Sequence, residues 1–297
     1  MRHFLSFVLG VLLLLALAGS AYAYLDGIEG FTIAEKPKQG FSILGYSQWY
    51  HFNKAADNDG DKVTMGPSTN LRGDILTGPT RIVYMSDHKL LGATWGADVY
   101  VTTVYAKLRS DFGNPTMSAF GDVIVDPLLL YWSPRNVKIN TGLNFLIPTP
   151  DGLGYHAYGV EPFVGLAFAT SVEGLTARAK LAYDFLGTND AGMSPFTGAT
   201  GDFEYGQELH LEGALDYAFN DNFRAGVSGY AFQQTTDSEF EGQEIHDMKG
   251  RVFALGPGVR YVTDSRKFAL EFRTLFEMGA RNKTQGISNW ISIYISF

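Results

Sequence analysis

The last eleven residues of the chain alternate between two kinds of side chain. Isoleucines and Phe297 take the odd positions from Ile287 onward, interrupted at Asn289, and serines, Trp290 and Tyr294 take the even ones. Successive side chains of a β-strand point to opposite faces of a sheet, so this pattern predicts a strand with one apolar and one more polar face. Its length is roughly what a tilted strand needs to cross a bilayer.

This ending resembles the C-terminal strand of bacterial outer-membrane barrels, which closes on an aromatic residue after apolar residues at alternate positions. The interruption at Asn289 limits the match to the last seven residues. The resemblance implies that the barrel-assembly machinery recognises the strand ending at Phe297. The alternative is an ordinary amphipathic strand that happens to be the last.

The first 23 residues have the features of a secretory signal peptide. A short basic start at Met1-Arg2-His3 precedes a mostly apolar run, and Ala21-Tyr22-Ala23 supplies the small-x-small cleavage pattern. We therefore expect export and cleavage after Ala23. A membrane-anchoring helix is the alternative, but the apolar run is short for a span and no basic stop follows it.

Composition narrows the class further. No later apolar run reaches the roughly 18 residues of a transmembrane helix. Aromatic residues make up 14% of the chain, with 34 glycines, as expected for a transmembrane β-barrel. The absence of cysteine excludes disulfides and thiolate sites. A net charge of −8 without a basic patch argues against a nucleic-acid partner.

Residues 24–39 show no periodicity, and we expect a periplasmic lead-in there. From residue 40 to 297 the sequence reads as about twelve alternating segments joined by turns. Connections alternate between short ones such as 133–136 and long ones such as 53–74, as in outer-membrane barrels with short periplasmic turns and longer outer loops. The predicted strands are 41–52, 75–84, 94–108, 122–132, 137–147, 158–169, 175–185, 208–219, 223–234, 252–262, 267–277 and 287–297.

The two faces of these strands differ in charge. In 175–185, Leu181 and its alternate neighbours are apolar, whereas Arg178 and Lys180 lie on the other face. A mid-strand charge facing lipid costs about 2–4 kcal/mol, so we expect the charged face to line the lumen. A soluble up-and-down barrel would show the same alternation with the faces exchanged. We also expect the lumen arginines 178, 224, 260 and 273 to pair with Glu161, Asp184, Glu212 and Glu271.

Several segments resemble the outer-membrane transporter family named for the MetA-pathway of phenol degradation. They are 142–149, the Glu161-Pro162 pair, 229–237, 255–261 and the region 120–132. The resemblance covers about residues 40–297, and their order along the chain is more specific than any one motif. It implies a barrel that admits small, often aromatic or apolar, molecules, and it carries over no catalytic residues.

Enzymatic sites are weakly supported. His210 lies on the lumen face between Glu208 and Glu212, and Ser228 is the serine that a lipase site would use. A loop with Glu244, His246 and Asp247 could serve a protease, but solvated acidic loops are commoner. The run from Asp57 to Asp61 resembles a calcium loop, yet Ser68 stands where the twelfth-position glutamate belongs.

The sequence therefore predicts an all-β, antiparallel up-and-down barrel of about twelve strands in a Gram-negative-type outer membrane. Its predicted function is passive uptake of small molecules, without catalytic residues, metal or cofactor; its predicted partners are membrane lipid and the solute. A barrel enzyme and a closed structural barrel are the alternatives. The residues predicted to line the solute path are Glu161, Arg178, His210, Glu212, Arg224, Tyr230, Phe232, Arg260, Glu271, Arg273, Trp290 and Tyr294.

Overall fold

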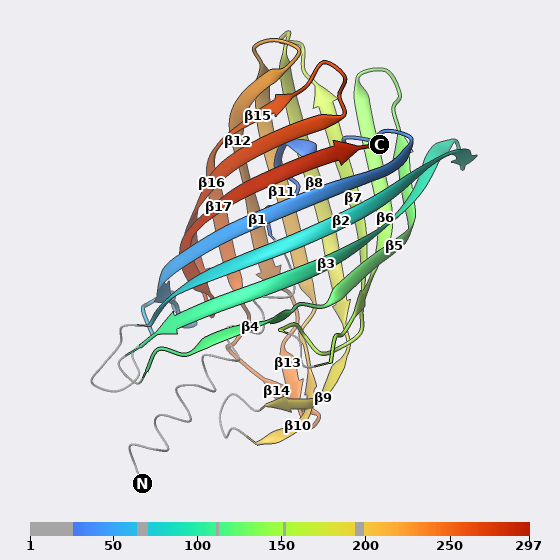
Figure 1. The fold of residues 1–297 in the computed structure, drawn as a ribbon. Coiled ribbons are helices and arrows are strands. Elements are labelled where there is room, and N and C mark those ends of the chain that lie inside the picture. Colours follow the sequence, from blue (N-terminus) through green and yellow to red (C-terminus); the bar gives the residue numbers. More distant parts are fainter. Residues whose placement is uncertain (1–25, 64–70, 111–112, 151–152, 194–198) are drawn as a thin grey trace.

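The computed structural model describes residues 26–63, 71–110, 113–150, 153–193 and 199–297, so the predicted signal peptide lies outside the described residues. Most of them form one antiparallel sheet curved into a barrel (Figure 1). The described residues contain no helix long and apolar enough to cross a membrane. The barrel strands are β1 (Gly40–Ala55), β2 (Arg72–Leu90), β3 (Ala93–Arg109), β5 (Val123–Trp132), β6 (Val137–Ile147), β7 (Gly159–Ala169), β8 (Leu175–Leu186), β11 (Glu208–Ala218), β12 (Phe223–Gln234), β15 (Arg251–Val262), β16 (Phe268–Arg281) and β17 (Thr284–Ser296).

The sheet closes on itself. The strand order is β2-β1-β17-β16-β15-β12-β11-β8-β7-β6-β5-β3, and pairing of β2 with β3 completes the ring. Every barrel strand therefore pairs with a neighbour on both of its sides. The first and last strands pair with Ser42 opposite Ser296 and Trp49 opposite Asn289. Each strand predicted from the sequence coincides with one barrel strand, which confirms the predicted architecture. Closure gives backbone N–H and C=O groups the hydrogen-bond partners that lipid cannot supply.

The two ends of the barrel differ. Short turns and the C-terminus lie at one end, which we call the short-turn end, and the longer connections lie at the other, the long-loop end (Figure 1). At the long-loop end β4 (Thr116–Phe120) pairs with β3. A second sheet is formed there by β9 (Thr188–Met193), β10 (Thr200–Glu204), β13 (Ser238–Phe240) and β14 (Gln243–Ile245). We expected only loops there. These strands are three to six residues long, too short for alternation to be read.

The outer and inner walls carry the predicted side chains. Leu181, Leu211 and Phe272 are 45%, 46% and 45% exposed on the outside of the barrel, whereas Arg178 and Glu271 are 8% and 3% exposed. The apolar stripes therefore face outward and the charged stripes inward. This is the orientation required of a barrel in hydrocarbon and the reverse of a soluble barrel.

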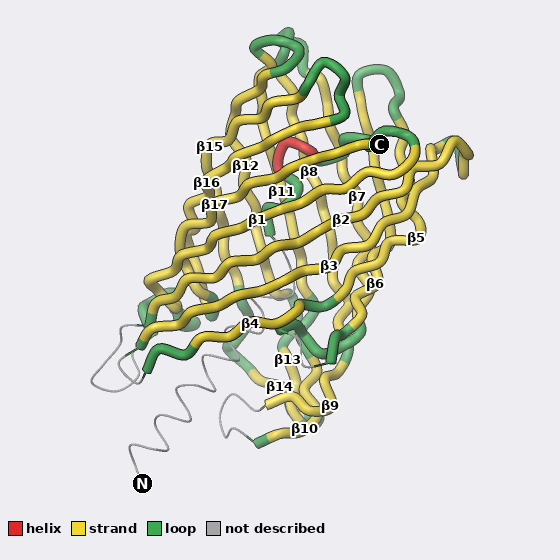
Figure 2. The backbone as a smooth tube through the Cα atoms, in the orientation of Figure 1, coloured by secondary structure: helices red, strands yellow, loops and turns green. Residues whose placement is uncertain are grey.

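The chain before β1 packs against the interior of the barrel. Residues 26–39, which we call the N-terminal segment, include the short 3-10 helix η1 (Gly30–Thr32). Figure 2 shows this helix, in red, behind the ribbon of β17 and beside β11. Phe31 is 0% and Ile33 is 1% exposed. Our prediction of a lead-in did not anticipate this packing, because the segment carries no periodic pattern.

Candidate functional site

The candidate site is the lumen, the space inside the barrel that the inner wall and the N-terminal segment share. All twelve residues predicted to line it lie on inward-facing positions of the barrel strands. Arg224 and Tyr294 are partly exposed towards the short-turn end, and the other ten are buried. The structure thus places the predicted residues on one surface; their binding of a solute stays a prediction.

Arg273 holds the beginning of the N-terminal segment. Its guanidinium donates to the carbonyl oxygens of Gly27 and Ile28, the second at 2.9 Å, and its Nε lies 2.7 Å from a carboxylate oxygen of Glu271. Gly30 has a φ of +49°, and a Cβ added there would overlap the same guanidinium. The turn therefore requires glycine at position 30, for both its backbone conformation and its close approach to the wall.

Glu29 is the centre of the ionic contacts between segment and wall. Its carboxylate lies 3.5 Å from Arg81 and 4.0 Å from Lys180, and its backbone N–H donates to Glu212 at 3.1 Å. Arg81 also binds Asp98 on the neighbouring strand, at 2.5 Å. All these side chains are buried, so the charges are compensated within a water-poor interior rather than by solvent.

The rest of the segment continues towards the short-turn end, contacting the wall at each step. The N–H of Phe31 donates to Glu271 at 3.2 Å, and Arg178 donates to the carbonyl of Ile33 at 3.1 Å. Glu35 lies 3.1 Å from Arg260, and Tyr294 accepts from the N–H of Lys38 at 3.1 Å. The contacts of the segment thus reach wall strands from β2 round to β8.

The arginine pairs differ in part from those we expected. Arg260 and Arg273 do pair with Glu271. Arg178 and Arg224 instead share Asp216, each at 2.7 Å from one of its two carboxylate oxygens. The prediction for those two arginines was wrong, because Asp216 lies on the same inner face and the register brings it beside both. One carboxylate can accept two guanidinium groups.

The aromatic residues of the inner wall are packed against cations rather than arranged as an open path. Lys283 lies 3.7 Å from the ring centre of Phe232, and Arg273 lies 5.8 Å from that of Trp290. Tyr230 donates to Glu277. These rings therefore help to fix the charged network through cation–π contacts and hydrogen bonds.

A cavity of about 450 Å³ opens at the short-turn end. It lies between the N-terminal segment and the wall and is bordered on the segment side by Glu35 and Lys38. Its wall side carries mostly cations, among them Lys138, Arg260 and Arg266, with Tyr294. A small anionic or polar solute is the kind of molecule that this surface suits.

His210 lies deep in the lumen near the long-loop end, beside carboxylates. Asp26 of the N-terminal segment, Asp184 and Glu208 all approach its ring. Ser228 does not complete a lipase arrangement: it is opposite Ala214, whereas His210 is opposite Phe232, four residues along the same strand. Four residues of strand span roughly 13 Å. Ser228 is therefore too far from His210 to be its nucleophile.

Sequence reasoning missed the residues of the N-terminal segment that complete the site. Asp26, Glu29 and Glu35 precede the first strand, so no alternation assigned them to a face. Arg81 and Asp98 lie on inward positions of predicted strands, and their opposite charges were the signal that could have identified them.

Comparison with known proteins agrees with this geometry. The model of a protein family described as "Putative MetA-pathway of phenol degradation" matches residues 52–293. The fold is similar to an outer membrane channel from Pseudomonas putida F1, with a TM-score of 0.73 and 14% identity over 89% of this chain and 98% of that one. It is also similar to the transport unit of the autotransporter AIDA-I from Escherichia coli, with a TM-score of 0.58 and 10% identity over 95% and 96% of the chains. No curated protein matches the chain.

Proposed function

Since the chain belongs to the family described as "Putative MetA-pathway of phenol degradation", we propose that it is an outer-membrane channel for the passive uptake of small molecules. The lipid-facing apolar wall and the charged inner wall support this proposal. So does the similarity in fold to a protein described as an outer membrane channel. Passage would be driven by the concentration difference, because the lumen offers binding groups but no energy source.

The observation that carries the proposal is that the N-terminal segment, which is not part of the barrel sheet, occupies the lumen. Among the described residues, no strand pairing joins the N-terminal segment to the wall. It is held instead by side-chain contacts such as those of Arg273 and Arg81 and by burial of Phe31. A segment held in this way can leave or shift without breaking the barrel. We propose that its displacement widens the path for solute.

The solutes that suit this lumen are small and carry both an apolar ring and a polar group. Tyr230, Phe232 and Trp290 are buried on the inner wall in one cluster with Ile28 of the N-terminal segment, so displacement of the segment would uncover their rings. The cavity at the short-turn end adds cations such as Lys138 and Arg260. Aromatic alcohols and aromatic acids combine these features. We therefore propose them as the solute class, ahead of sugars, which lack the apolar ring.

Swelling of liposomes that contain the purified barrel tests this function. Full-length chain and a variant lacking residues 24–37 are compared with a phenol, a benzoate and a hexose at equal osmolarity. We expect faster swelling than in protein-free liposomes, greatest for the aromatic solutes and greater still for the truncated chain. Absence of permeation by every solute through both chains would refute the channel and favour a structural barrel.

Two further assignments belong to the proposal. We propose no catalytic role, since Ser228 lies four residues away from the position opposite His210 and the carboxylates of Asp26 and Asp184 approach the imidazole. We also propose that the barrel-assembly machinery recognises β17 together with Phe297, which follows it, is 70% exposed and donates its N–H to the carbonyl oxygen of Phe41. Deleting Phe297 should reduce the amount of barrel assembled in cells without changing conductance per assembled barrel.

A further inference from the structure

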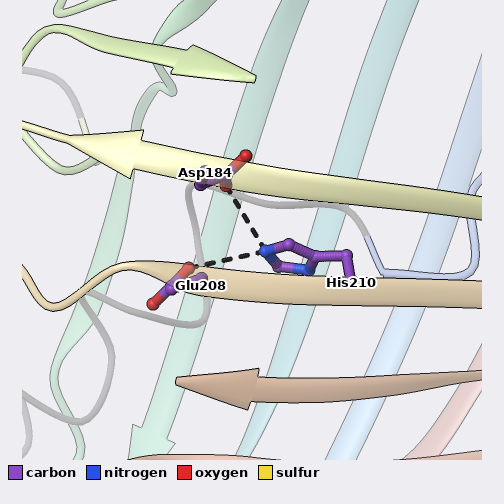
Figure 3. A group of neighbouring side chains, drawn as sticks. All are labelled: Asp184, Glu208 and His210. Carbon is purple, nitrogen blue, oxygen red and sulfur yellow. Dashed lines mark ion pairs between the residues drawn. The ribbon is translucent and has the colours of Figure 1, made fainter. Parts of the chain in front are cut away.

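Three side chains near the long-loop end of the lumen converge on one point. Asp184 of β8 and Glu208 of β11 are directly opposite each other in the paired strands, and His210 follows two residues along on the same face. They are 0%, 3% and 1% exposed. Figure 3 shows both carboxylates turned towards the same nitrogen of the imidazole. That nitrogen, Nε2, lies 3.3 Å from Asp184 and 3.7 Å from Glu208.

These separations match the ligand spacing around a metal ion. Nitrogen and carboxylate ligands lie about 2.0–2.2 Å from a tetrahedral zinc ion, which places any two of them roughly 3.3–3.6 Å apart. The three ligand atoms here all lie within 4.8 Å of one another. Ion pairs elsewhere in the lumen range from 2.5 Å for Arg81 with Asp98 to 4.0 Å for Lys180 with Glu29. The feature that suits a metal ion is therefore the approach of two carboxylates to one imidazole nitrogen.

Asp184 is buried beside His210 and the carboxyl group of Glu161. Neither of its carboxylate oxygens accepts a hydrogen bond within hydrogen-bonding geometry from the described residues, although the residue is fully buried. Buried carboxylates are stabilised by donors, by cations or by metals, and an uncompensated one is costly. With Asp26 and Glu208 also present, three carboxylates surround one imidazole. Even a protonated imidazole would leave the group with a negative excess that a divalent cation would neutralise.

The surroundings orient His210 as they do in metal sites. Its other nitrogen, Nδ1, lies 2.9 Å from the carboxylate of Asp26. Donation from Nδ1 to a carboxylate leaves Nε2 free of a proton in the neutral ring, which is the form that binds a metal. Tyr155 donates its hydroxyl to Glu208, and Phe232 packs edge-on against the imidazole, with ring centres 5.2 Å apart. The ligand set thus has a second layer that holds it in place.

We propose that Asp184, Glu208 and His210 form a binding site for a divalent transition-metal ion such as Zn²⁺. One imidazole and two carboxylates are ligands of zinc, with a fourth position left for water or solute. Because Asp26 belongs to the N-terminal segment, the ion would couple this segment to β8 and β11 of the wall. The proposal is independent of transport, since a closed barrel could bind the same ion.

Calorimetric titration of the folded full-length chain with Zn²⁺, in detergent and with any histidine tag removed, tests the site. We expect one ion per chain in the high-affinity phase. His210→Ala and Asp184→Asn should each weaken binding at least about tenfold, and Asp26→Asn by about 10–100-fold, because it orients the ligand. His246→Ala is the matched control: His246 belongs to a second, exposed group with Asp237 and Glu244 at the long-loop end, so its loss should leave the high-affinity phase unchanged.

Two results would overturn the proposal. One is the absence of stoichiometric binding by the full-length chain; the other is binding that His246→Ala removes and His210→Ala leaves intact. Heat-dependent migration on gels checks that each variant is folded. Anomalous scattering from zinc-soaked crystals of the unmodified chain needs no variant, and a peak beside Nε2 of His210 is expected. A strong peak elsewhere, without one at His210, would refute the site.

Discussion

Replacing Gly30 by alanine should displace the N-terminal segment from the lumen while leaving the barrel wall intact. Gly30 has a φ of +49°, and an added Cβ would overlap the guanidinium of Arg273. That guanidinium holds the carbonyls of Gly27 and Ile28. The substitution therefore acts on the segment and on its principal anchor together.

The magnitude follows from two costs. A non-glycine residue in the left-handed region is disfavoured by about 1–2 kcal/mol. Moving the guanidinium aside loses at least one hydrogen bond from a charged donor, worth about 1.5–3 kcal/mol. Together they weaken docking by about 2.5–5 kcal/mol. Each 1.36 kcal/mol is a factor of ten, so the ratio of displaced to docked segment should rise at least about 70-fold.

Conductance of the barrel in planar bilayers measures this displacement. Gly30→Ala should conduct more than the unmodified chain and approach the variant that lacks residues 24–37. Gly40→Ala is the matched control, because Gly40 also has a positive φ, of +92°, but an added Cβ meets nothing within 4 Å. Equal conductance of Gly30→Ala, Gly40→Ala and the unmodified chain would refute the reasoning that the segment obstructs the lumen and that its anchor depends on Gly30.

Three further outcomes are expected. Leu211→Arg should destabilise the barrel in lipid vesicles by about 2–4 kcal/mol, because it places a charge in hydrocarbon; an unchanged urea midpoint would contradict the outward position of Leu211. Arg81→Met should cost at least about 3 kcal/mol in the same assay, because it leaves Asp98 buried without its cation, and full stability would show that this pair is dispensable. Burial would raise the pKa of Glu35, but Arg260 and further cations hold it below its ordinary value of 4.5. The pair therefore stabilises the docked segment above that pH and is lost only as pH falls further. Glu35→Gln should raise conductance by the same factor at every pH from 8 to 5, and a factor that shrinks within that range would contradict this pairing.

The strands could be predicted from the sequence because lipid and lumen impose opposite demands on neighbouring residues. In β8, Leu181 must be apolar, whereas Arg178 is stable only inside. This two-residue period is local and needs no knowledge of the partner strand. It located every barrel strand and assigned the twelve lumen residues to the inner face.

The N-terminal segment could not be predicted in the same way. Asp26, Glu29 and Gly30 owe their positions to residues more than fifty positions away, such as Arg81 and Arg273. A segment without regular structure has no period that reports which surface it contacts. Its docking depends on the assembled barrel, and in the sequence of the segment the two glycines that approach the wall with positive φ, Gly27 and Gly30, are its trace.

The ion pairs inside the lumen were predicted only in part, for a related reason. Alternation determines which face a charge occupies, but the partner depends on register and tilt. Arg178 is opposite Ala214 and reaches Asp216 two residues along. The small sheet at the long-loop end was missed because its strands are only three to six residues long and two separate loops build it: β9 pairs with β10 in one loop, β13 with β14 in another, and β10 with β13 joins them.

The orientation of the wall is the claim on which the channel, its lining and the docked segment all depend. Trp49 of β1 and Trp290 of β17 test it directly, because Gln48 is opposite Trp290 and Trp49 is opposite Asn289, so the two rings lie at nearly one depth. Trp49 is 54% exposed on the outside and Trp290 is 0% exposed on the inside. In vesicles of brominated lipid, a chain with Trp49 as its single tryptophan should lose most of its fluorescence, and one with only Trp290 should lose little. Stronger quenching of Trp290 than of Trp49 would contradict the account.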